Sequence, residues 1–184
     1  MPDLYLGTAE LEQGVDHILA SPRDNGELQL IVRRPDVDAR ETPESARLDT
    51  VQGMVGDNWL ARGSRHMPDG VADPGMQLNI MNTRVVHLIA QSKARWALAG
   101  DQLFVDMDLS YENLPPGTQL ALGDAVVEVT ALPHAGCKKF AARFGVDATT
   151  FVNSGRGKSL NFRGICAKVV KSGDIKVGDL ARKL

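Results

Sequence analysis

Cysteine, aromatic residues and long apolar runs are all scarce in this chain of 184 residues. Its two cysteines allow at most one disulfide, which excludes a disulfide-stapled scaffold and a zinc site built from four cysteines. No apolar run approaches the roughly 20 residues that a transmembrane helix needs, and the start, Met1–Tyr5, lacks the basic and apolar regions of a signal peptide. We therefore expect a cytoplasmic protein with reduced thiols and no membrane partner.

The chain also lacks a strong excess of charge. Its net charge of −2 at pH 7 argues against general nucleic-acid binding. The basic residues are unevenly placed, however, because segment 134–163 holds six of them against a single acid, Asp147. A local basic field in an otherwise acidic chain favours a small anionic ligand over a long polyanion, although a solvated basic face would have the same composition. The six are Lys138, Lys139, Arg143, Arg156, Lys158 and Arg163.

Several common catalytic motifs are absent. The tripeptide Gly157-Lys158-Ser159 resembles the end of a phosphate-binding P-loop, but Val152 stands where that motif requires glycine. His134 and Cys137 have the spacing of some zinc pairs, yet no second pair of ligands follows. The Gly-x-Ser-x-Gly elbow of hydrolases and the dinucleotide-binding fingerprint are also missing. These absences exclude nucleotide hydrolysis and leave a thiol as the main candidate for chemistry.

Short strands dominate the predicted secondary structure. Alternation and β-branched content predict them over 27–34, 76–81, 102–107, 119–122, 125–132, 161–171 and 175–177. Capping signals predict helices over about 43–51, after Asn82, and over 137–144 and 147–153. The aperiodic segment from Gly56 to Gly75 is long enough for a functional or lid role. We expect a mainly β fold with peripheral helices (α+β), a β-barrel in one domain over 1–184 that includes residues 1–55.

Cys137 is the strongest candidate for function. It lies among basic residues and three positions after His134, and positive charge favours thiolate over thiol. This makes Cys137 a candidate nucleophile or metal ligand. An isolated cysteine also commonly serves as a small buried hydrophobe, and Cys166, in an apolar strand-like run, fits that description. We therefore expect Cys137 to be functional and Cys166 to lie in the core.

Three ordered segments resemble the MOSC domain, which is named for the C-terminal part of molybdenum cofactor sulfurases. They are Gly136-Cys137-Lys138-Lys139-Phe140 with Arg143-Phe144-Gly145, then Arg163-Gly164-Ile165-Cys166-Ala167-Lys168-Val169-Val170, and then Gly173-Asp174-Ile175-Lys176-Val177-Gly178-Asp179. The upstream segments 56–59 and 100–110 are similar to those of small, stand-alone bacterial members. The resemblance covers nearly the whole chain from about residue 28.

The resemblance implies a strand-rich MOSC-type barrel and one reactive cysteine, which matches Cys137. In one branch this cysteine carries sulfur as a persulfide. In another, which reduces N-hydroxylated compounds, it ligates the molybdenum of a pterin cofactor. In that case His134 would donate a hydrogen bond to the substrate or alter the reactivity of Cys137. A structural role for this imidazole is equally open. The residues expected to pair with the phosphate of the molybdenum cofactor are Lys138, Arg143, Arg156, Lys158 and Arg163, of which Arg163 could equally fix a turn.

The partners expected from the resemblance are a small anionic cofactor or substrate and another protein. This chain has no room for the pyridoxal-phosphate domain of the large sulfurases, so a separate pyridoxal-phosphate desulfurase would supply sulfur, or an electron-donor protein would supply electrons. Two other functional hypotheses stay open. One is a non-catalytic barrel that binds an anion or a protein. The other is a redox cycle between Cys137 and Cys166, which would need Cα atoms within about 7 Å.

Overall fold

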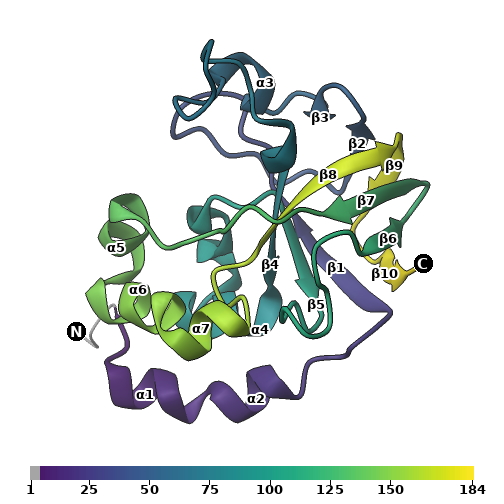
Figure 1. Ribbon diagram of the computed structural model, residues 1–184. Coiled ribbons are helices and arrows are strands. Elements are labelled where there is room, and N and C mark those ends of the chain that lie inside the picture. Colours follow the sequence, from purple (N-terminus) through teal and green to yellow (C-terminus); the bar gives the residue numbers. More distant parts are fainter. Residues whose placement is uncertain (1–4) are drawn as a thin grey trace.

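A closed β-barrel forms the centre of the computed structural model, which describes residues 5–184 (Figure 1). Residues 1–4 lie outside the described residues. Two predictions include them: the absence of a signal peptide at the start of the chain and the single domain over 1–184. Among the described residues the wall has seven strands, and only the pair β4 and β5 is parallel. In order around the barrel they are β1 (Gly26–Ile31), β10 (Leu180–Lys183), β6 (Gln119–Leu122), β7 (Ala125–Val129), β8 (Ile165–Lys171), β4 (Leu78–Asn82) and β5 (Leu103–Asp106).

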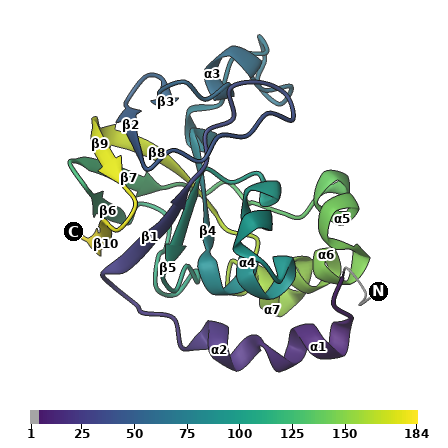
Figure 2. The ribbon, with the colours of Figure 1, turned by 180° about the vertical axis from the view of Figure 1, so that it is seen from behind.

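A small second sheet stands at one end of the barrel. Its order is β3 (Gly53–Met54), β2 (Ser45–Asp49) and β9 (Gly173–Lys176), and all its pairs are antiparallel. The chain then passes through α3 (Trp59–Arg62) and the 3₁₀ turn η1 (Pro74–Met76) before it enters β4. Figures 1 and 2 show α3 and its loops above the barrel, on the same side as the small sheet.

The remaining helices lie together on another side of the barrel (Figures 1 and 2). They are α1 (Thr8–Gln13), α2 (Val15–Leu19), α4 (Thr83–Ala90), the 3₁₀ helix η2 (Lys93–Ala99), α5 (Lys138–Phe144), α6 (Val146–Asn153) and α7 (Gly155–Ser159). The start of α4 is fixed as expected, because the Asn82 side chain accepts a hydrogen bond of 2.7 Å from the backbone N–H of Arg84.

Two apolar cores follow from this arrangement. One fills the barrel and includes Leu28, Ile80, Leu103 and Val127. The other lies between the outer wall and the helices, and includes Phe104 of β5, Phe140 of α5 and Phe151 of α6. Phe104 faces outward and Leu103 inward because side chains alternate along a strand. The barrel wall is therefore covered by apolar packing on both faces where the helices meet it.

The mainly β fold with peripheral helices is confirmed, but the helix expected over 43–51 is wrong. Residues Ser45–Asp49 form β2, which pairs with β9 and β3 and buries Leu48 completely. The Asp49 carboxylate then accepts hydrogen bonds from the N–H groups of Val51 and Gln52, which starts the hairpin to β3. Local capping signals were overruled by pairing with a strand more than a hundred residues away.

Other predicted elements have different bounds. The strand expected over 161–171 begins only at Ile165, because Asn161 has a left-handed φ of 49° and Gly164 one of 107°. The strand expected over 125–132 ends at Val129. Helices α1, α2 and α7 and strand β10 carry too few residues for a clear periodic pattern and were not predicted.

Replacing Leu103 by alanine should lower the free energy of unfolding by about 2–5 kcal/mol, because it leaves a cavity in the barrel core where the side chain is fully buried. The matched control is Leu180→Ala on β10, where the side chain is 52% exposed and the expected change is below about 0.5 kcal/mol. Urea denaturation measures both changes, and the slope of the unfolding free energy against urea concentration should be the same in all three proteins. Equal losses in the two variants would contradict this assignment of the core.

Candidate functional site

Cys137 lies at the start of α5, where it is exposed to solvent. The backbone just before it is fixed to α6 by a reciprocal pair of hydrogen bonds. The N–H of Gly136 donates to Oδ1 of Asn153 at 2.8 Å, and Nδ2 of Asn153 donates to the Gly136 carbonyl at 3.0 Å. Behind the cysteine, Phe140 and Phe144 anchor α5 in the outer core. The thiol therefore projects from a backbone that is held on both sides.

The environment of Cys137 favours its thiolate. Partial burial alone would raise the pKa of the thiol, but the backbone N–H groups of Phe140 and Lys139, followed by the charge of Arg163, outweigh that effect and lower the pKa below its ordinary value. The sequence predicted a lowered pKa for Cys137, which agrees with this result, but it attributed the effect to the neighbouring basic side chains. The stabilisation comes chiefly from the first turn of α5 rather than from the neighbouring lysine side chains.

Cys166 lies in the core, as expected. It is completely buried in β8, and its sulfur accepts a hydrogen bond of 3.4 Å from Nδ2 of Asn79. Burial is the largest influence and raises the pKa of its thiol to about 12. Both cysteines are free, and a buried, protonated Cys166 is a poor partner for a redox cycle with Cys137.

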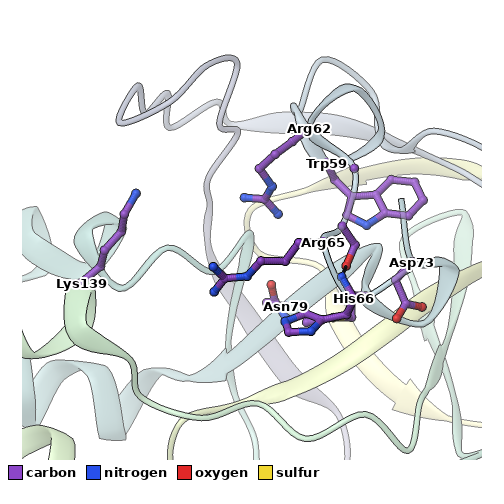
Figure 3. Close-up of a pocket in the computed structure, with 10 residues that line it drawn as sticks. Trp59, Arg62, Arg65, His66, Asp73, Asn79 and Lys139 are labelled. Carbon is purple, nitrogen blue, oxygen red and sulfur yellow. Dashed lines mark hydrogen bonds between the residues drawn. The ribbon is translucent and has the colours of Figure 1, made fainter. Parts of the chain in front are cut away.

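Three adjoining hollows lie near Cys137; Lys139 lines all three, and Cys137 lines two of them. We call them together the basic trough. The cysteine hollow, of about 170 Å³, is bordered by Cys137, Arg40 and Arg143. The loop hollow, of about 550 Å³, lies beside the segment between α3 and η1 and is shown in Figure 3. The outer hollow, of about 720 Å³, is a broad opening lined by Cys137, Lys138 and Arg65.

Positive charge exceeds negative charge in the cysteine hollow. Arg143 donates to the Leu98 carbonyl at 2.9 Å and forms an ion pair of 3.2 Å with Asp38, which is largely exposed. Arg40 donates only to its neighbouring carbonyl at Ala39, and its Nε is buried without a hydrogen-bond partner among the described residues. Burial, followed by the charges of Arg143 and Arg34, lowers the pKa of Arg40. Such crowded, partly unpaired guanidinium groups are suited to an anionic ligand.

Two buried ion pairs support the floor of the trough. Arg34 binds the fully buried Asp57 through Nε at 2.9 Å and Nη2 at 2.7 Å. Arg163 binds the fully buried Asp101 at 2.6 Å, and its guanidinium lies over the Phe140 ring at 4.8 Å. Arg163 is therefore a buried supporting residue beneath α5, and its charge acts on Cys137 from below.

His134 lies beside this second ion pair. Its Nδ1 is 3.5 Å from Oδ1 of Asp101, and both atoms are buried without a hydrogen-bond partner among the described residues. Burial is the main reason that the pKa of His134 lies well below its ordinary value, and the charge of Arg163 adds to it. The imidazole is thus neutral at physiological pH, and it does not line any of the three hollows.

The structure gathers only part of the predicted anion-binding set. Lys138 and Arg143 line the trough, and Arg163 lies beneath it. Arg156 and Lys158 line none of its hollows, because both project from α7, where Arg156 pairs with Glu12 of α1 at 3.4 Å. Sequence reasoning missed Arg40, Arg62 and Arg65. The signal available for two of them was the long segment 56–75, whose length indicated a functional role.

Metal ligands are sparse near the trough. Across residues 5–184 there is no group of three or more His, Cys, Asp and Glu side chains able to hold a metal ion. A metal at Cys137 would accordingly need most of its ligands from a cofactor. The same residues contain no helix that is long and apolar enough to cross a membrane.

In native protein, iodoacetamide should alkylate Cys137 alone. The rate should rise with pH around a midpoint below that of a free cysteine peptide, because the folded environment lowers the pKa of this thiol. Mass spectrometry locates the label, and initial rates between pH 5 and 10 give the midpoint. Cys137→Ser is the control, and it should react only after denaturation exposes Cys166. A midpoint at or above that of the free peptide would contradict this description of the site.

Comparison with known proteins identifies the family. The model of the MOSC domain matches residues 76–182, whereas no curated protein matches the chain. The solved structure of YuaD from Bacillus subtilis shares 14% identity at a TM-score of 0.58 and covers 85% of this chain and 93% of its own. YiiM from Escherichia coli shares 16% identity at a TM-score of 0.54, and the match covers 86% of this chain and 69% of that one. YiiM from Geobacillus stearothermophilus shares 12% identity at a TM-score of 0.51, and the match covers 89% of this chain and 74% of that one. These likenesses concern the fold, and the matched model covers more than half of the sequence: this chain belongs to the MOSC domain family.

Proposed function

We propose that this MOSC-domain protein binds a molybdenum cofactor in the basic trough, with the Cys137 thiolate as a ligand of the metal, and that it is an oxidoreductase for N-hydroxylated compounds. The observation that carries the proposal is an exposed thiol of lowered pKa that borders a hollow lined by Arg40 and Arg143. MOSC domains are associated with this cofactor.

The residues present fit such a group. A thiolate is the kind of soft ligand that a high-valent metal accepts, and the described residues offer no set of side chains that could replace the cofactor's own ligands. Among residues 5–184 the buried Nε of Arg40 has no hydrogen-bond partner, and the exposed Asp38 is the one carboxylate that forms an ion pair with Arg143. We therefore assign the anionic part of the cofactor to Arg40, Arg143 and Lys139, and the metal to Cys137.

When bound, the cofactor supplies a redox-active metal. The protein's own residues would do the rest: α5 positions Cys137, the guanidinium groups of Arg40 and Arg143 hold negative charge, and the N–H groups in the first turn of α5, followed by the charge of Arg163, favour the thiolate. The neutral His134 would act as a positioning residue through Asp101 rather than by touching the substrate. Electrons would come from a donor protein that approaches the exposed side of Cys137.

Sulfur carriage on Cys137 is the second candidate, and the outer hollow favours it. The thiol also borders this broad opening, which a sulfur-donor protein could reach. The thiolate would attack the terminal sulfur of a donor persulfide, forming a new S–S bond while the bond to the donor's cysteine sulfur breaks and that sulfur leaves as thiolate. The same low pKa that suits a metal ligand makes this attack possible.

Protein purified anaerobically from a host that makes the cofactor should contain near-stoichiometric molybdenum by plasma mass spectrometry. Cys137→Ser should lose the metal. Arg143→Gln should weaken its retention by about 10-fold, because one charge-assisted contact is lost. Lys158→Gln, a basic residue outside the trough, is the control and should retain the wild-type content.

Circular dichroism confirms that each variant is folded. Molybdenum absent from the wild-type protein, or unchanged in Cys137→Ser, would overturn the assignment of the metal to Cys137. In that case persulfide labelling of Cys137 tests sulfur carriage, and a protein with neither metal nor persulfide would support a non-catalytic barrel.

A further inference from the structure

The loop hollow is lined by two arginines that form no ion pair among the described residues. Arg62 ends α3, and Arg65 lies three residues later in the segment before η1. Neither side chain has an ion pair or hydrogen bond with any of the described residues. Figure 3 shows both guanidinium groups pointing into the same space, with Lys139 on the opposite side. This hollow is therefore lined by three cations from two different parts of the chain, of which Lys139 also lies 4.0 Å from the exposed Asp38.

Most other arginines of the protein form an ion pair with an aspartate or a glutamate. Arg34 and Arg163 hold buried aspartates, and Arg84 holds Asp106 at 2.7 Å. The single carboxylate that lines the loop hollow is Asp73, whose Oδ1 accepts a hydrogen bond of 2.9 Å from the N–H of Gly75; it forms no ion pair with any of the described residues, so two arginines face one unpaired acid there. The contrast indicates that the positive charge of Arg62 and Arg65 is left for a ligand.

The shape and walls of the hollow also suit a small organic molecule. Its volume of about 550 Å³ lies in the range of small-molecule sites, whereas the cysteine hollow holds only about 170 Å³. The Trp59 indole forms one wall, and Met76 adds further apolar surface. Lys139 belongs to both hollows, so a molecule in the loop hollow lies next to whatever binds at Cys137.

We propose that the loop hollow is the substrate compartment and that it selects organic substrates carrying a carboxylate or phosphate group, which Arg62 and Arg65 bind. This inference rests on the proposed function, since it assigns the cysteine hollow to the cofactor and the loop hollow to the substrate. Arg62 is an exposed residue, and partial desolvation of its guanidinium followed by the charge of Arg34 lowers its pKa, while the charge of Asp57 acts in the opposite direction. An incoming anion would relieve that repulsion, whereas a neutral molecule would not.

The test uses two anionic probes, phenyl phosphate and benzoate, and the neutral probe phenol. Isothermal titration calorimetry measures their binding to the full-length protein as purified, with molybdenum content recorded for each sample. Both anions should bind saturably, and phenol should bind at least about 10-fold more weakly. Arg62→Gln and Arg65→Gln should each weaken binding of the anions by about 10-fold. The matched control, Arg156→Gln on α7, should leave binding unchanged, since Arg156 lines none of the three hollows.

Fluorescence locates the probe. The chain has two tryptophans, Trp59 and Trp96, and Trp96 lies in the outer core away from the trough. In a Trp96→Phe protein the remaining signal comes from Trp59, and it should change on addition of phenyl phosphate. Calorimetry on the unaltered protein gives the answer independently if this variant does not fold.

The outcomes separate this inference from the proposed function. Equal binding of phenol and phenyl phosphate, or binding that depends on Arg143 but not on Arg62 or Arg65, would overturn the anionic substrate compartment while leaving the cofactor assignment intact. Loss of molybdenum in Arg62→Gln or Arg65→Gln would also overturn it, because the loop hollow would then hold the cofactor. Anion binding that depends on Arg62 and Arg65 in protein without any molybdenum would support this ligand class and contradict the cofactor assignment instead.

Discussion

The buried ion pair between Arg34 and Asp57 connects the segments that form the trough. The side chain of Asp57 is fully buried and accepts hydrogen bonds from the backbone N–H and the side chain of Arg34, which follows β1. The same carboxylate accepts the N–H of Trp59 at the start of α3, and Arg34 donates in turn to the carbonyl of Gly100. One pair of charges thus fixes the end of β1, the start of α3 and the turn before β5. Removing either partner would leave an uncompensated buried charge, which is far more costly than losing a surface ion pair.

A second buried pair, Asp101 with Arg163, extends this support to the thiol. Asp101 follows Gly100 directly, and Arg34 donates to the Gly100 carbonyl, so the first pair is hydrogen-bonded to the residue next to the second pair. Arg163 lies over the ring of Phe140, and Phe140 anchors the helix that begins at Cys137. The charge of Arg163 also favours the thiolate. The ion pair that stabilises the fold here therefore also contributes, after the N–H groups of α5, to the lowered pKa of the exposed cysteine.

The two halves of the chain contribute different parts of the trough. The thiol, Lys139 and Arg143 come from the loop after β7 and from α5, whereas Arg40, Arg62 and Arg65 come from the segments between β1 and β4. The matched MOSC model begins at residue 76, after the last of these three arginines. Charge and shape within the trough consequently depend on a part of the chain that lies outside the matched model.

The sequence by itself determined the fold class and the contrast between the two cysteines. Alternating strands with helices between them are local patterns, and they predicted a barrel with peripheral helices and a buried Cys166 in β8. Only the tertiary structure decided that residues 45–49 form a strand, because β2 exists through pairing with β9 and β3. It also decided which basic residues share a site. Arg156 and Lys158 are close to Cys137 in sequence but project from α7, whereas Arg40, Arg62 and Arg65 are distant in sequence and line the trough. Charge along a chain can be counted from the sequence, but the side chains that converge on one hollow are set by strand pairing and by buried ion pairs between distant segments.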